Sequence, residues 1–240
     1  MYETLPRTAD QRRPHDYLLR GFGGAARTIV RRIYDVDVYG AEHFPASGPV
    51  VVAANHTGFA DGPLMAIFAP RPLHALTKSE MFDGPMGVFL GAAGQIPLIR
   101  EEASDLHAVR LALRVLGTGG AVGIFPEGTR GTGEMLTAHG GAAYLALVSG
   151  SPVLPLVFLG TRRAGSAATF PPRGSRFVMQ YGEPLDLGAT PWPRRSAEVA
   201  RATEQVRLAL SGLLQQAVDR HGIPTPGPLP DVPNKKEHHD

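Results

Sequence analysis

The chain has 240 residues, of which 43% are apolar, and its formal net charge at pH 7 is only +2. This length suits one α/β domain with a sizeable core, and so small a net charge does not favour nucleic acid as a partner. The sequence contains no Cys, which excludes a disulfide framework, a thiolate metal site and a cysteine nucleophile.

The two ends of the chain differ in character from its middle. Residues 1–13 are polar and charged, so we expect a disordered lead without a secretory signal. Residues 222–240 contain five prolines and a charged end, and we expect this tail to be disordered too. No uncharged apolar run reaches membrane-spanning length, so we expect the chain to be soluble or to lie on a membrane, without a transmembrane helix.

Residues 14–35 are predicted to form an amphipathic N-terminal helix. Its apolar side chains fall on one stripe at the 3.6-residue period, with Arg20, Arg27 and Arg31 opposite. Such a helix either packs on the core with a solvated arginine face or lies on an anionic membrane surface. Residues 21–26 also match the dinucleotide pattern GxGxxA. Because no strand precedes them and they lie inside a helix, we reject a nucleotide site there.

Residues 36–221 are predicted to form one domain in which short apolar strands alternate with helices. The expected strands cover residues 36–39, 49–54, 73–77, 95–99, 121–125, 153–159 and 176–181. Ser104 is expected to cap a helix, and Pro155 favours an edge or an irregular position for its strand. This alternation predicts an α/β fold: a mixed, largely parallel sheet flanked by helices and preceded by the amphipathic helix.

Three polar clusters stand where predicted strands end. Parallel strands place their carboxyl ends along one edge of a sheet, and ligands of open α/β sheets bind at that edge. We therefore expect these clusters to meet. They are Asn55 and His56 with Asp61, Arg100 with Glu101, and Glu127 with Gly128, Thr129 and Arg130.

His56 and Asp61 have the pattern of an orientable general base. The Asp61 carboxylate would fix the tautomer of His56 and stabilise the imidazolium that forms. The chain has neither a Cys nor a GxSxG elbow, so this base lacks a protein nucleophile and points to a hydroxyl of the substrate. From the spacing alone, a structural pair at a helix start is the alternative.

Arg100 and Arg130 stand beside glycine-containing turns. Guanidinium groups together with exposed backbone N–H groups make a phosphate site, and the alternative for either arginine is a surface ion pair. Glu127 follows a buried strand, where a carboxylate is more often functional than on a helix face. The sequence shows no metal-ligand spacing, and we expect no metal.

These residues carry a resemblance to a known family. Residues 55–61, NHTGFAD, resemble the NHx4D motif of the glycerolipid acyltransferases, which include 1-acyl-sn-glycerol-3-phosphate acyltransferases. Residues 125–130, FPEGTR, resemble the family's motif of that name without a mismatch. Residues 95–100 and 153–157 resemble its second and fourth motifs, and the likeness covers about residues 36–185.

The resemblance implies a role for each matched residue. His56 would be the general base that removes the proton from the acceptor hydroxyl, and Asp61 would orient it. The freed oxygen would attack the thioester of acyl-CoA or an acyl carrier protein, which is a co-substrate, so no cofactor is expected. The acceptor's glycerol phosphate would be held by Arg100, Glu127, Gly128, Thr129 and Arg130.

The implied activity is acyl transfer to a lysophospholipid, most directly 1-acyl-sn-glycerol 3-phosphate, giving phosphatidic acid in phospholipid biosynthesis. The alternatives are another acceptor (glycerol 3-phosphate, another lysolipid, a glycolipid or an aminolipid), a non-catalytic lipid-binding relative, and a thioesterase. The chain departs from the family at Gly58, where Ser is frequent, and at His139, where Lys is frequent.

Lysophospholipids and long acyl chains partition into bilayers. The resemblance therefore implies a peripheral protein on the cytoplasmic face of a membrane, with the helix at 14–35 as its candidate anchor. The glycine-rich apolar stretch at 84–99 is either the lining of an acyl groove or ordinary core. The oligomeric state does not follow from the sequence.

Overall fold

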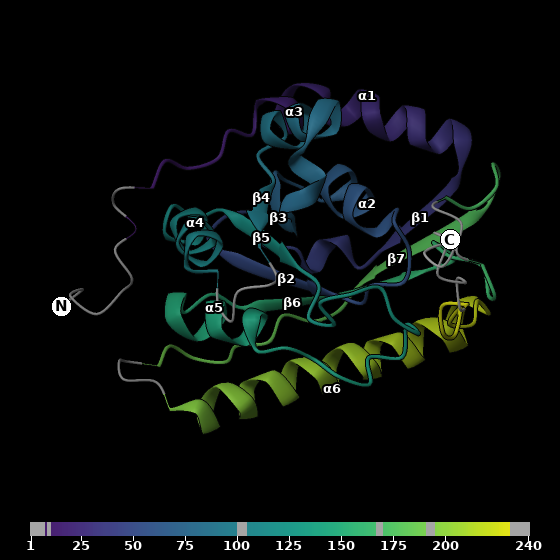
Figure 1. The fold of residues 1–240 in the computed structure, drawn as a ribbon. Coiled ribbons are helices and arrows are strands. Elements are labelled where there is room, and N and C mark those ends of the chain that lie inside the picture. The colour runs from purple at the N-terminus through teal and green to yellow at the C-terminus, as the bar shows by residue number, and fades with distance from the viewer. Residues whose placement is uncertain (1–7, 9–10, 100–104, 167–169, 191–194, 231–240) are drawn as a thin grey trace, which may run out of the picture.

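The chain folds into an open sheet with helices on both faces (Figure 1). The computed structural model describes residues 8, 11–99, 105–166, 170–190 and 195–230. The described residues form seven strands, in the spatial order β1-β7-β6-β2-β5-β3-β4. Their bounds are β1 Asp35–Tyr39, β2 Val50–Ala54, β3 Leu73–Lys78, β4 Ile96–Leu98, β5 Ala121–Ile124, β6 Val153–Leu159 and β7 Arg176–Tyr181.

The pairing is parallel throughout this sheet, except between β6 and β7. Helices cover both faces of such a sheet, which explains why every residue of β2 and β6 is buried and apolar. The predicted class is confirmed: one α/β domain whose mixed, largely parallel sheet is flanked by helices and preceded by an N-terminal helix.

The helices lie in two layers (Figure 1). One layer holds α1 (Tyr17–Ile33) and α2 (Asp61–Phe68), and α3 (Gly84–Ala92) lies on the same side. The other holds α4 (Leu106–Gly117), α5 (Gly141–Ser149) and α6 (Ser196–His221). Two short 3-10 turns, Ala41–His43 and Ser79–Phe82, complete the elements. Among the described residues, no helix combines the length and the apolar character that a membrane crossing requires.

Two helix ends show how local sequence sets these bounds. The Asp105 carboxylate accepts hydrogen bonds from the N–H groups of His107 and Ala108, at 3.0 Å each, so Asp105 caps α4. The predicted cap, Ser104, lies outside the described residues. Helix α6 ends at His221, and Gly222 caps it with a φ of +66°, a left-handed conformation that favours glycine.

Pro155 lies in an interior strand, so the edge position expected for it is wrong. Strand β6 runs between β2 and β7. The ladder with β7 begins one residue later, at Leu156 and Tyr181, so the missing N–H of Pro155 removes no ladder bond. The Pro155 carbonyl instead accepts from the Gly182 N–H at 2.9 Å. The irregular position was the correct alternative.

Arg27 fastens α1 to the end of α2. Its Nε donates to the Ile67 carbonyl and its Nη2 to the Ala69 carbonyl, at 2.7 Å each. Carbonyl groups at a helix C-terminus lack partners within the helix, so a guanidinium there satisfies them. Arg27 was predicted to lie on a face opposite the packed stripe, and it instead contributes to packing. Residues 21–26 lie inside α1, as the rejection of a nucleotide site required.

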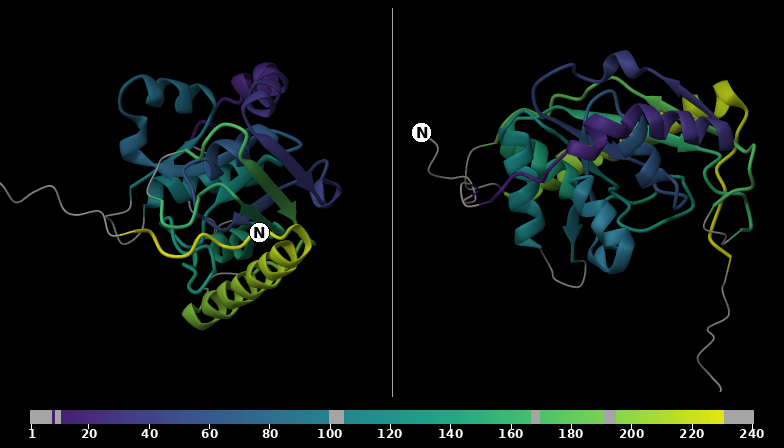
Figure 2. Two further views of the ribbon diagram at one scale, coloured as in Figure 1. Left: turned by 90° about the vertical axis from the view of Figure 1, so that its right-hand side faces the viewer. Right: turned by 90° about the horizontal axis from the view of Figure 1, so that it is seen from above.

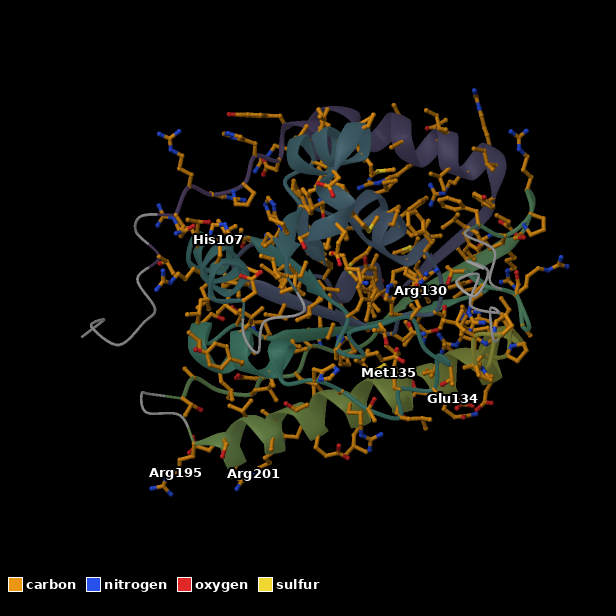
Figure 3. All side chains as sticks on the ribbon, viewed as in Figure 1. His107, Arg130, Glu134, Met135, Arg195 and Arg201 are labelled. Atoms are coloured by element: carbon orange, nitrogen blue, oxygen red, sulfur yellow. The ribbon has the colours of Figure 1, made fainter. Side chains whose placement is uncertain are left out.

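The strand directions bring three loops to one edge of the sheet. Strands β2 and β5 are parallel neighbours, with Val50 opposite Ala121 and Ala53 opposite Ile124. The residues that follow them therefore leave the sheet side by side. Strand β6, parallel to β2 on its other side, ends at the same edge. This edge lies toward the right in Figure 3, where Arg130 is labelled.

Candidate active site

His56 is held by Asp61 where β2 passes into α2. The His56 Nδ1 donates to Asp61 Oδ2 at 2.9 Å. In the neutral imidazole, this bond to a carboxylate oxygen places the ring proton on Nδ1 and leaves Nε2 as an acceptor. The His56 ring also stacks on Phe125, with the centroids 4.1 Å apart and 21° between the planes. Two independent contacts therefore orient the imidazole.

A single oxygen of Asp61 serves three donors. Besides the His56 ring, Oδ2 accepts from the backbone N–H groups of Thr57 at 2.7 Å and Gly58 at 2.8 Å. The side chain is fully buried, and these charge-assisted bonds offset the cost of burying the carboxylate. Helix α2 begins at Asp61 as predicted, but the carboxylate turns back onto the preceding loop and does not cap the helix.

The loop after β5 is joined to His56 in both directions. The His56 N–H donates to Glu127 Oε1 at 2.8 Å, and the His56 carbonyl accepts from the Gly131 N–H at 2.9 Å. A Cβ at position 131 would lie 2.7 Å from Glu127 Oε2, so a side chain there would displace the end of the Glu127 side chain. Glu127 therefore braces the base from the neighbouring loop.

Burial raises the pKa of the Glu127 carboxyl above its ordinary value of 4.5. The hydrogen bond from the His56 N–H and the charge of His56 lower this pKa, and the nearby negative charge of Asp61 raises it. Two carboxylates and one imidazole thus share a partly dry region. In that region the electrostatic interaction between a proton acceptor and a charged partner is stronger than it would be in water.

Gly58 is in close contact with Thr161. A Cβ at position 58 would lie 2.4 Å from the Thr161 carbonyl oxygen, and Thr57 Oγ1 lies 3.0 Å from Thr161 Oγ1. The chain thus has a steric reason for glycine where the related motif often carries Ser. The Gly58 N–H bond to Asp61 ties this loop to the start of α2.

The other predicted site residues lie around the turn after Glu127. Gly128 has a φ of +70°, and a Cβ there would lie 2.9 Å from the His139 ring, so His139 packs directly on this turn. Thr129 and Arg130 are exposed. Arg100 lies outside the described residues. The structure therefore brings Asp61 and Glu127 each into direct contact with His56, and Arg130 is exposed beside them.

Arg162 belongs to this site, although no motif in the sequence points to it. It follows β6 and is 5% exposed, and its Nε donates to the Thr57 carbonyl at 2.9 Å. Burial and the positive charge of Arg130 lower the pKa of this guanidinium, whereas the negative charge of Asp61 raises it. Arg162 therefore lies close enough to interact electrostatically with Asp61, the partner of His56, and with the exposed Arg130. Arg162 and Arg163 are adjacent residues in the loop after β6, and nothing in the sequence indicates that the first is buried and the second exposed.

The arrangement suits removal of a proton from a hydroxyl group. Asp61 is sealed from solvent while the His56 side chain remains 17% exposed, so a ligand can reach Nε2 but not the carboxylate. A substrate hydroxyl would give its proton to Nε2, and Asp61 would stabilise the imidazolium.

Comparison with known proteins gives consistent results. The family model described as Acyltransferase matches residues 35–159. The 1-acyl-sn-glycerol-3-phosphate acyltransferase of Bacillus subtilis (strain 168) is 29% identical over 197 residues, which cover 80% of this chain and 96% of that protein. The human 1-acyl-sn-glycerol-3-phosphate acyltransferase alpha is 36% identical over 126 residues, 51% of this chain; the match spans only 44% of the human protein.

A solved structure shares the fold. It is the crystal structure of the 1-acyl-sn-glycerophosphate (LPA) acyltransferase PlsC from Thermotoga maritima, with a TM-score of 0.62 and 23% identity, covering 85% of this chain and 80% of that one. The Acyltransferase model spans more than half of the residues and includes both His56 and Glu127. This chain therefore belongs to the Acyltransferase family.

Proposed function

We propose that this acyltransferase moves a fatty acyl group from an acyl thioester to the free hydroxyl of 1-acyl-sn-glycerol 3-phosphate, giving phosphatidic acid. The observation that carries the proposal is the His56 imidazole. Asp61 holds it by Nδ1, and it leaves Nε2 as a base at a rim that also carries Arg130. The relatives in B. subtilis and human, which are named for this reaction, support the same acceptor.

In the proposed reaction, His56 Nε2 takes the proton of the acceptor hydroxyl as the oxygen attacks the thioester carbonyl. The carbon–sulfur bond then breaks, and the thiol leaves with the proton that His56 returns. Asp61 stabilises the imidazolium between these two steps. The thioester is that of acyl-CoA or of an acyl carrier protein. The acceptor's glycerol phosphate is held by Arg100, Glu127, Gly128, Thr129 and Arg130, with the two arginines on its phosphate group.

We infer that the reaction takes place at a membrane surface, on its cytoplasmic face. Both the acceptor and the product are membrane lipids. The exposed apolar side chains of α1 and α3 support a peripheral contact, because Tyr17 and Val88 are 73% and 76% exposed.

The direct test is an incubation of the purified protein with labelled acyl-CoA and a panel of acceptors, with the products identified by mass. The panel holds 1-acyl-sn-glycerol 3-phosphate, glycerol 3-phosphate, other lysophospholipids and a glycolipid. We expect phosphatidic acid as the main labelled lipid, and His56→Ala should lower turnover at least ~100-fold, since a positioned base contributes about 10²–10⁴-fold.

Label released as free fatty acid without any acylated lipid would identify a thioesterase and refute the proposal. Near-normal turnover of His56→Ala would refute the assignment of the base. If a different acylated lipid carried the label, the protein would still be an acyltransferase, but with another acceptor.

A further inference from the structure

Arg162 reaches three separate segments of the chain. Its Nε donates to the Thr57 carbonyl at 2.9 Å, and its Nη2 donates to the Gly131 carbonyl at 3.1 Å and to the Gly227 carbonyl. Its Nη1 donates to the Pro228 carbonyl at 3.3 Å. A buried guanidinium is costly unless its N–H groups are satisfied, and here four backbone carbonyls satisfy them.

Two of these segments are the loops that build the base. Thr57 is next to His56, and its N–H is one of the Asp61 bonds. Gly131 donates its N–H to the His56 carbonyl while its own carbonyl accepts from Arg162. The guanidinium plane therefore bridges the loop after β2 and the loop after β5, whose separation sets the position of His56 relative to Glu127.

The third segment is the chain after α6. Residues 222–230, part of the tail expected to be disordered, are described as an irregular segment that crosses the end of the molecule where this edge of the sheet lies (Figure 2, left, in yellow). Its Gly227 and Pro228 carbonyls bond to Arg162, and Pro226 lies beside Gly133, whose added Cβ would be 3.3 Å from Pro226 Cδ. Residues 231–240 lie outside the described residues.

We propose that Arg162 is a positioning residue for the acyl transfer. It holds the loops of His56 and Glu127 at a fixed separation and fastens residues 225–228 beside them. The planar fork of arginine spreads five donors over three nitrogen atoms and here makes four bonds, whereas lysine has only three donors on one nitrogen atom. A displacement of about 1 Å of a catalytic group costs on the order of 100-fold in rate, so the loop separation controls turnover.

The chain contains a matched control for loss of an arginine that binds several carbonyls. Arg71 donates to the carbonyls of Pro45, Gly119 and Gly48. These residues precede β2 and β5, at the opposite edge of the sheet from His56. Arg71→Lys therefore removes the same kind of interaction from the same two strands without touching the site.

The experiment compares Arg162→Lys with Arg71→Lys and with wild-type full-length protein, well below the melting temperature of each. We expect Arg162→Lys to lower kcat by about 10- to 100-fold with the donor KM within about twofold of wild type. In hydrogen exchange, we expect the Thr57, Gly58 and Gly131 amides to exchange at least ~10-fold faster, and those of β1 to be unchanged. Arg71→Lys should keep wild-type kcat and wild-type exchange at these amides.

A folded Arg162→Lys protein with wild-type kcat and protected loop amides would overturn the proposal, even if its melting temperature falls. Arg162→Gln provides the same readouts if the lysine variant does not fold. The kcat arm rests on the proposed function. If wild-type protein transfers no acyl group, that function fails, and the hydrogen-exchange arm still decides whether Arg162 holds the two loops.

Discussion

Asp61 Oδ2 accepts the His56 ring N–H together with two backbone N–H groups from the loop that carries His56. The shape of the loop and the orientation of the base therefore depend on the same oxygen atom. Gly58 supplies one of those N–H groups, and Thr161 lies against its Cα. A substitution at Gly58 must either push Thr161 away or weaken the bond to Asp61.

Gly58→Ser is thus expected to destabilise this protein, although Ser is frequent in related motifs. The new Cβ would start 2.4 Å from the Thr161 carbonyl oxygen. Overpacking of this kind costs about 1–3 kcal/mol, which corresponds to a decrease in Tm of roughly 2–10 °C. Thermal unfolding measures this, and Gly62→Ser is the control because a Cβ at position 62 meets open space. Equal Tm values for the two variants would show that Thr161 can move away from the new side chain without a loss of stability.

Arg130→Ala is expected to weaken acceptor binding selectively. Arg130 is exposed at the rim, where it is free to bind an anionic headgroup, and a charge-assisted bond is worth about 1.5–3 kcal/mol. The acceptor KM should rise about 10- to 100-fold while the donor KM changes little. Steady-state kinetics with each substrate varied in turn measures the split, and Arg163→Ala, also exposed, is the control. An equal rise in both KM values would contradict the assignment of Arg130 to the acceptor site.

At this scale the sequence predicted the contact between His56 and Asp61, and placed Glu127 at the same edge. Those residues follow strands whose ends a parallel sheet must bring together. The sequence could not predict the hydrogen bond from the His56 N–H to Glu127 or the contacts of Arg162. Both depend on the distance between loops that are about 70 and 105 residues apart in sequence, and periodicity carries no information on that distance.

Among the elements, α3 differs from the other helices in its surroundings. It is apolar on all sides, and Met86, Val88 and Phe89 are 48%, 76% and 57% exposed. Residues 84–98 carry no charged side chain. The segment that follows α3 also meets the segment that precedes α1, since the His15 carbonyl packs on Gly94. An exposed apolar surface of this kind fits the interface of a bilayer better than water.

The double variant Val88→Asp, Phe89→Asp is therefore expected to lose membrane binding. Fully burying a Val or Phe side chain is worth about 1.5–3 kcal/mol, so vesicle affinity should fall at least ~10-fold. Cosedimentation with anionic phospholipid vesicles measures this, while turnover of detergent-dispersed acceptor should persist. Leu208→Asp is the control, because Leu208 is 55% exposed on α6 in the opposite layer. Unchanged vesicle binding by the double variant would refute a membrane role for α3.

The elements themselves were largely predictable, because each strand is a short apolar run and each helix has a periodic stripe. The failures have local causes. Pro155 lies in the interior of the sheet because the β7 ladder begins only after it, and α4 starts from Asp105, whose carboxylate reaches two N–H groups. The position of Pro155 depends on the strand that it meets, which its own segment does not contain. The cap of α4 depends on a choice between two adjacent residues, Ser104 and Asp105, that are both good N-cap residues.

For the whole molecule, a buried histidine makes stability depend on pH. His74 in β3 is fully buried, and its Nδ1–H donates to the Gly94 carbonyl at 2.7 Å. Its Nε2 is buried without a hydrogen-bond partner among the described residues. Burial lowers the pKa of His74 from its ordinary 6.5; the Gly94 bond and Asp16 oppose this, and the charges of Arg13 and Arg20 add to it.

The sign of the pH effect follows from this lowered pKa. Below pH 6.5 the unfolded chain binds a proton at His74 that the native state still excludes, so the free energy of unfolding falls as the pH decreases toward the lowered native value. Above pH 6.5 neither state is protonated, and the contribution is constant.

His74→Asn keeps a donor for the Gly94 carbonyl and removes the titration. Between pH 7.5 and 5, Tm should therefore fall less in His74→Asn than in wild type. Thermal unfolding at several pH values measures the difference, and His107→Asn, an exposed position on α4 (Figure 3), is the control. If wild type and His74→Asn lose stability in parallel, the acid sensitivity arises at groups other than His74.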